Sequence, residues 1–173
     1  MKIELRKMVV DYLCYQAEIG YETMYKQERM GFLFGSRRQN RILVTKALFY
    51  RGGKKGRTGI IYHPDDFIKR GRELASTFRK RWIGSYHTHV EESKNISFGF
   101  SPEDRRSFLK EPTLIELVIT VWSTGKSRFR SPGKKRLLIL KNYGAINYRY
   151  IISGITKTET GATLTKTVIT PVK

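Results

Sequence analysis

The distribution of short apolar runs is the feature that most constrains the fold of this chain. Runs of strand length, rich in β-branched and aromatic residues, recur between Gly, Pro and charged residues. We expect strands at 3–9, 31–35, 41–50, 58–62, 82–88, 114–122, 136–142, 146–153 and 162–170, the last at a sheet edge. Helical spacing interrupts them at 12–25, 66–80 and 102–110, with Asp11 as the first N-cap. This pattern predicts a mixed α/β domain in which helices flank a largely antiparallel sheet.

Size and composition favour one globular domain in a reducing compartment. The chain has 173 residues, of which 39% are hydrophobic and 28% charged. Its only cysteine, Cys14, excludes an internal disulfide and a multi-cysteine zinc site, and we expect a buried helix residue there. No apolar run approaches the length of a membrane span, and the N-terminal MKIELRKMVV carries charges throughout. We therefore expect a soluble cytoplasmic protein without membrane contact.

The net charge is unusually high, at +19, from 34 Lys and Arg against 15 Asp and Glu. Such a field attracts polyanions and acidic protein surfaces. The basic residues cluster locally at 37–38, 54–57, 79–81 and 134–136. Two interpretations stay open: an ordinary solvated surface, or a contact surface for nucleic acid or an acidic partner.

A pair of histidines, His87 and His89, lies within the expected strand at 82–88 or directly after it. Residues two apart on a strand point to the same face, so both imidazoles can approach one point. Neutral imidazole is a good zinc ligand. Two ordinary surface or hydrogen-bonded histidines would give the same pattern. The third histidine, His63, is better interpreted as a loop residue beside a helix start.

The segment Ser101-Pro102-Glu103-Asp104 can also contribute to a metal site. Residues three apart at a helix start share a face, so Asp104 could supply an oxygen ligand while Ser101 points to the same place. Ser, Pro and an acid in this order are equally a capping box that starts a helix. By this reasoning Asp104 cannot both cap the helix and fully ligate a metal. Glu28, before an apolar run bracketed by glycines, gains meaning only in combination.

Taken together, Glu-x-x-Gly-x-Leu-x-Gly from Glu28, Gly-x-Tyr-His-Thr-His and Ser-x-x-Asp resemble the motif of the JAMM (MPN-plus, Mov34/MPN/PAD-1) zinc metalloproteases. The resemblance implies one MPN-like domain over residues 1–173. It also implies that His87, His89 and Asp104 bind Zn²⁺ and that a water fills the fourth site. By the same resemblance, Glu28 is the general acid and base, and Ser101 stabilises the oxyanion.

The chain departs from that motif at two places. Val90 stands where the family commonly has Pro, directly after the second histidine. The gap from that histidine to Ser101 is also longer, with residues 90–100 between them. The ligand types are unchanged, and we expect the extra residues to enlarge the loop over the site.

The chemistry expected of such a site is amide hydrolysis. Zinc with three protein ligands keeps a position for water and lowers its pKa towards about 7. The resemblance implies a deubiquitinase-like isopeptidase that acts on the C-terminal tail of a ubiquitin-like or sulfur-carrier protein. The alternative is a basic MPN-fold module that binds nucleic acid or an acidic protein without catalysis. The sequence sets no oligomeric state.

Overall fold

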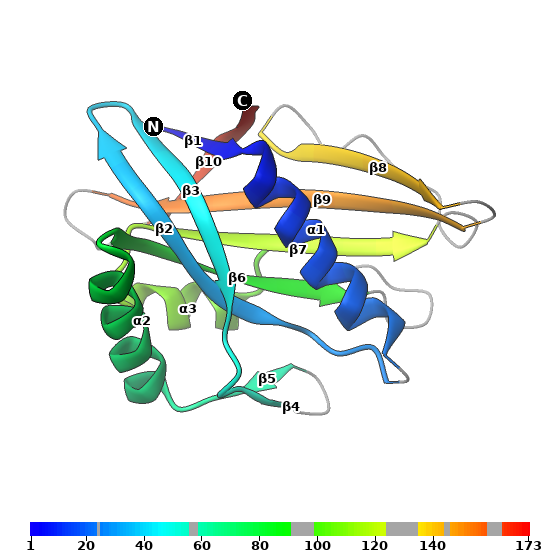
Figure 1. Cartoon of the computed structure of the whole chain (residues 1–173), viewed down its shortest axis with the longest axis horizontal. Helices are drawn as coiled ribbons and strands as arrows, with labels where there is room; N and C mark the ends of the chain where they lie inside the picture. The colour runs from blue at the N-terminus through cyan, green and yellow to red at the C-terminus, as the bar shows by residue number, and fades with distance from the viewer. Residues whose placement is uncertain (24, 56–58, 91–98, 124–134, 144–145, 159–163) are drawn as a thin grey trace.

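The structure is a computed structural model of the whole chain (Figure 1). It describes residues 1–23, 25–55, 59–90, 99–123, 135–143, 146–158 and 164–173. The helices are α1 (Lys7–Glu22), α2 (Pro64–Phe78) and α3 (Pro102–Lys110). The strands are β1 (Lys2–Arg6), β2 (Met30–Arg38), β3 (Arg41–Phe49), β4 (Lys54–Lys55), β5 (Ile60–Ile61), β6 (Arg81–Val90), β7 (Ile115–Ser123), β8 (Leu137–Tyr143), β9 (Ile146–Lys157) and β10 (Leu164–Val172).

The large sheet closes on itself. Its strands follow the order β10-β1-β3-β2-β6-β7-β9, and β9 pairs again with β10, so seven strands form a barrel. The long strand β9 makes this possible, because it pairs with β8 over residues 146–152 and with β10 over residues 154–157. Three of the pairings, β1–β10, β1–β3 and β6–β7, are parallel.

The expected fold class is therefore wrong. The sequence led us to a mixed α/β, MPN-like, largely antiparallel curved sheet flanked by helices, whereas the sheet is closed and contains both parallel and antiparallel pairs. The expectation of an edge strand at 162–170 also fails, since β10 is bonded on both sides. Among the described strands of the large sheet, β8 is the one that pairs on a single side. Local alternation reports which face of a strand is buried, but it carries no information on which distant strand closes the sheet.

Two apolar clusters hold α1 and α2 on the sheet. The larger one packs α1 against it through Val9, Leu13 and Ala17, among others. The smaller one surrounds Phe67 of α2 with Met30, Phe32, Phe34 and Tyr50. α1 starts directly after β1, without a side-chain cap, because Val9 and Val10 are already buried there. The N-cap is Arg6, so the N-cap predicted at Asp11 was five residues late.

The other local expectations fare better. α2 begins at Pro64, and His63 is the exposed residue just before it, as expected of a loop histidine. α3 has the bounds predicted for it, and Cys14 is fully buried in α1. In the described part of the chain, no helix combines the length and the apolar character that crossing a membrane requires.

Candidate metal centre

Strand β6 brings the two imidazoles together. It lies inside the sheet, antiparallel to β2 and parallel to β7, and its register aligns His87 with Met30 on one side and with Val118 on the other. His87 and His89 share the outer face of this strand. Their Nε2 atoms are 3.1 Å apart, and both side chains are largely buried. A histidine pair on a well-packed central strand is held in a fixed position.

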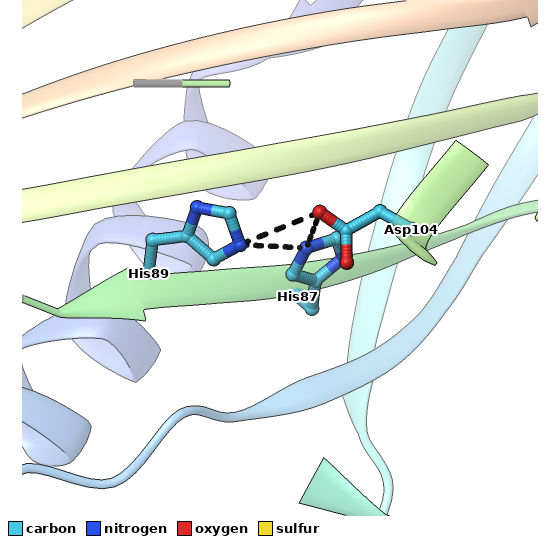
Figure 2. A group of neighbouring side chains, drawn as sticks. All are labelled: His87, His89 and Asp104. Atoms are coloured by element: carbon cyan, nitrogen blue, oxygen red, sulfur yellow. Dashed lines mark hydrogen bonds and ion pairs between the residues drawn. The ribbon is translucent and has the colours of Figure 1, made fainter. Parts of the chain in front are cut away.

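Helix α3 brings the carboxylate of Asp104 to the same point. The Ser101 N–H donates to Asp104 Oδ2 over 2.6 Å, and the Asp104 N–H donates to Ser101 Oγ over 3.1 Å, which completes a capping box. The same Oδ2 lies 3.5 Å from His87 Nε2 and 3.6 Å from His89 Nε2 (Figure 2). The cap therefore aims the carboxylate at the imidazoles. We expected that Asp104 could not both cap the helix and fully ligate a metal; the structure shows the cap and places the carboxylate beside both imidazoles.

The spacing of the three atoms fits a tetrahedral metal ion. They are separated by 3.1, 3.5 and 3.6 Å. Zinc bound to nitrogen and oxygen at about 2.0–2.1 Å in a tetrahedron holds its ligands roughly 3.3–3.4 Å apart. Two imidazoles and one carboxylate are also a donor set of the catalytic zinc type, which leaves a fourth position for water. His87, His89 and Asp104 form a group that could hold a metal ion.

Glu116 of β7 contacts His87 at Nδ1, the ring nitrogen that does not face Asp104. Its Oε1 lies 2.9 Å from His87 Nδ1, and its side chain is buried among strand residues. A carboxylate at this place accepts the Nδ1 proton and orients the ring so that Nε2 faces Asp104 and His89. Burial disfavours the charged imidazole, but hydrogen bonds to Asp104 and Glu116 outweigh burial and raise the His87 pKa well above its usual value. The arrangement strongly favours positive charge at this point.

The pKa of Asp104 shifts in the opposite direction, below its usual value. Burial alone would raise its pKa, but the His87 imidazole and the two groups of Ser101 lower it below its usual range. Asp104 is therefore ionised under ordinary conditions. An ionised carboxylate facing two imidazoles supplies the charge that a divalent cation requires.

Glu28 lies in the same cleft as the three ligands. The next residue, Arg29, is hydrogen-bonded to Thr88, which lies between the two histidines. The Arg29 N–H donates to Thr88 Oγ1 over 2.8 Å, and the Arg29 carbonyl accepts from the Thr88 N–H over 2.7 Å. Glu28 lies two residues before Met30, the partner of His87, and both residues line the cleft. The cleft, of about 530 Å³, is lined by Glu28, Ser101, Asp104 and both histidines.

The charge of this cleft is opposite to that of the chain. Five of the 15 acidic residues line it, and no described lysine or arginine does. The five are Glu28, Glu103, Asp104, Glu111 and Glu116. Burial, followed by the charge of Glu116, raises the pKa of Glu111 to about 7, and its carboxylate accepts a hydrogen bond from Ser85 over 2.8 Å. The acidic lining of the cleft therefore contrasts with the net charge of +19 of the whole chain.

The sequence analysis found five residues of this cleft and missed its buried acids. All five expected residues, Glu28, His87, His89, Ser101 and Asp104, line one cleft. Glu116 escaped notice because it lies within an expected core strand, yet a charged residue inside the apolar run of residues 114–122 is itself a signal of a buried partner. The loop expected to be enlarged, at about 90–100, falls mostly on residues 91–98, which lie outside the described part.

Comparison with known proteins adds information on the fold alone. No protein-family model and no curated protein matches this chain. Among solved structures, the solution structure of protein DSY2949 from Desulfitobacterium hafniense is similar, with a TM-score of 0.61 and 14% sequence identity. The similarity covers 99% of this chain and 93% of that one. At this identity the likeness shows a shared architecture and carries no statement about chemistry.

Proposed function

We propose that the protein is a zinc-dependent peptidase of the JAMM type, in which His87, His89 and Asp104 hold the metal. The observation that carries the proposal is the mutual spacing of their three donor atoms, 3.1, 3.5 and 3.6 Å, which suits one tetrahedral ion. The order of the motifs along the chain supports the same function. The proposal does not depend on the MPN-like sheet, which the chain does not have.

In this proposal Glu28 and Ser101 have separate roles in the reaction. Bound zinc supplies Lewis acidity, which makes water a nucleophile near neutral pH and polarises a carbonyl group. Glu28 accepts the proton of the attacking water and returns it to the leaving nitrogen. Ser101 accepts a hydrogen bond through its oxygen from the Asp104 N–H, which leaves its O–H to donate to the carbonyl oxygen of the substrate.

The proposed substrate is the C-terminal tail of a ubiquitin-like or sulfur-carrier protein, cleaved at a peptide or isopeptide bond. Such a tail is extended and can add to a strand edge. Strands β4 and β5 form a two-stranded sheet of their own, and Ile60 of β5 lines the cleft. Among the described residues, the outer edges of this small sheet have no strand partner. The cytoplasm, expected from the single cysteine, is the proposed compartment.

The test combines metal analysis with matched variants. We expect the purified protein to contain about one zinc per chain and to lose it on His87→Ala. His63→Ala is the matched control, because His63 is exposed and lies before α2, and it should keep the metal. Glu28→Gln should keep zinc and lose cleavage of ubiquitin-like conjugates, whereas Glu103→Gln, on the rim of the same cleft, should keep both.

Two results would overturn the proposal. Equal zinc content in the His87→Ala and His63→Ala variants would show that the metal binds elsewhere. Full cleavage by Glu28→Gln would remove the assigned mechanism even if zinc were present.

The competing candidate, a basic module that binds nucleic acid or an acidic protein without catalysis, is favoured only by the net charge of +19. It predicts that His87→Ala leaves every function intact.

A further inference from the structure

A second, smaller cavity lies next to the metal centre and has the opposite charge. Its volume is about 120 Å³, space for roughly four water molecules. Phe100 lines it and also touches the metal centre, with its ring centroid 6.2 Å from that of His87. Phe100 therefore contacts both the cavity and the metal centre.

Four cationic side chains line this cavity. They come from three separate places in the chain: Arg105 from α3, Lys135 and Arg136 from the segment before β8, and Lys166 from β10. No acidic residue of the described part lines the cavity, and none pairs with any of the four cations. Four positive groups gathered without an anion repel one another, and an anionic ligand would relieve that repulsion.

A buried hydroxyl group at the same place also lacks a partner. Ser153 of β9 lines the cavity and is only 6% exposed, and its Oγ has no hydrogen-bond partner in the described part of the chain. Leaving a buried hydroxyl unsatisfied is unfavourable, so such a group in a polar cavity points to a ligand.

The sheet fixes the distance from this hydroxyl to the metal centre. Val118 of β7 pairs with His87 on one side and with Ser153 on the other, so the three residues form one row across the sheet. Neighbouring strands are about 4.8 Å apart, which puts Ser153 roughly 10 Å from His87. The two sites are close but separate.

We propose that this cavity binds a phosphate group. A tetrahedral oxyanion fits the volume, and its charge of up to two matches four cations better than a single carboxylate would. Arginine and lysine bind phosphate through charge-assisted hydrogen bonds, and the Ser153 hydroxyl supplies a further donor. The phosphate belongs either to the free ion or to the end of a nucleotide. This inference does not rest on zinc or on peptidase activity.

The test is a titration of the full-length protein with inorganic phosphate, followed by ³¹P NMR at constant ionic strength. We expect saturable binding by the unmodified protein. Ser153→Ala should weaken it by about threefold to tenfold through loss of one donor, and Lys166→Gln by about fivefold or more. Lys69→Gln is the matched control, because Lys69 is an exposed residue of α2 that does not line the cavity. It should change the affinity less than about twofold.

A second arm distinguishes the two sources of phosphate. Adenosine 5′-monophosphate that competes with the ion and shows the same sensitivity to Ser153→Ala supports a site for a terminal phosphate. Binding of inorganic phosphate alone supports a site for the free ion.

Absence of saturable binding would overturn the proposal, as would equal losses in Lys166→Gln and Lys69→Gln, which would trace binding to the general positive field. If Ser153→Ala fails to fold, Arg136→Gln provides the same comparison. Treatment with a metal chelator should leave phosphate binding unchanged, which separates this test from that of the zinc site.

Discussion

The buried carboxylate of Glu116 is hydrogen-bonded to His87, with 2.9 Å between its Oε1 and Nδ1 of the imidazole. The contact joins two neighbouring parallel strands, since Ser85, two residues before His87, pairs with Glu116. A carboxylate behind a histidine fixes the tautomer and the orientation that a metal ligand needs. The metal centre therefore extends into the core of the sheet.

Replacing Glu116 by Gln should weaken zinc binding without removing it. The amide oxygen can still accept the Nδ1 proton, but the negative charge is lost, and the imidazole becomes a poorer donor. We expect the zinc dissociation constant to rise by about tenfold to a hundredfold. Competition with a chromogenic chelator measures the dissociation constant. Glu103→Gln is the control for the loss of one negative charge. Equal affinities of the two variants would contradict the role assigned to Glu116.

Ser101→Ala should affect both the fold and the reaction. The hydroxyl caps α3 by accepting from the Asp104 N–H, so its loss should lower the free energy of unfolding by about 1 kcal/mol. If the hydroxyl also donates to the substrate carbonyl, kcat should fall by about a hundredfold or more. Ser101→Thr keeps a hydroxyl and should retain the cap. A loss of stability without a loss of kcat would limit Ser101 to the cap.

Gly84→Ala should disturb the metal centre through the backbone. A Cβ at Gly84 would lie 2.4 Å from the carbonyl oxygen of Ile115 and 2.4 Å from its Cγ1. β6 and β7 would have to separate at the point that brings Glu116 to His87. We expect a loss of stability of about 1–3 kcal/mol or more, together with weaker zinc binding. Thermal unfolding measures the first. An alanine variant of wild-type stability would show that the strands can adjust.

Cys14 should be chemically silent in the folded protein. Burial is the main reason that its thiol pKa rises from 9.0 to about 12, so the reactive thiolate is scarce at pH 8. We expect no reaction with a disulfide reagent until denaturant is added. The thiol pKa is higher in the folded protein than in the unfolded chain, so the free energy of unfolding should fall between about pH 9 and 12. A Cys14→Ala variant should lack this part of the pH dependence.

The sequence was informative wherever the cause of a structure is local. The histidine pair, the start of α3 and the buried position of Cys14 depend on spacing within a few residues, and these features can be predicted. Closure of the sheet depends on β10, which pairs with its neighbour in sequence, β9, and also with the distant strand β1. No local pattern reveals the second pairing. Glu116 was missed for a related reason, because its partner is 29 residues away.

The ring of strands closes through β10, which lies between β9 and β1. During synthesis β1 is made before residues 164–172, which form one of its two neighbours. The residues of the metal centre, from 28 to 116, are all present well before that. The strand that closes the ring therefore contributes no residue to the cleft that holds the candidate metal ligands.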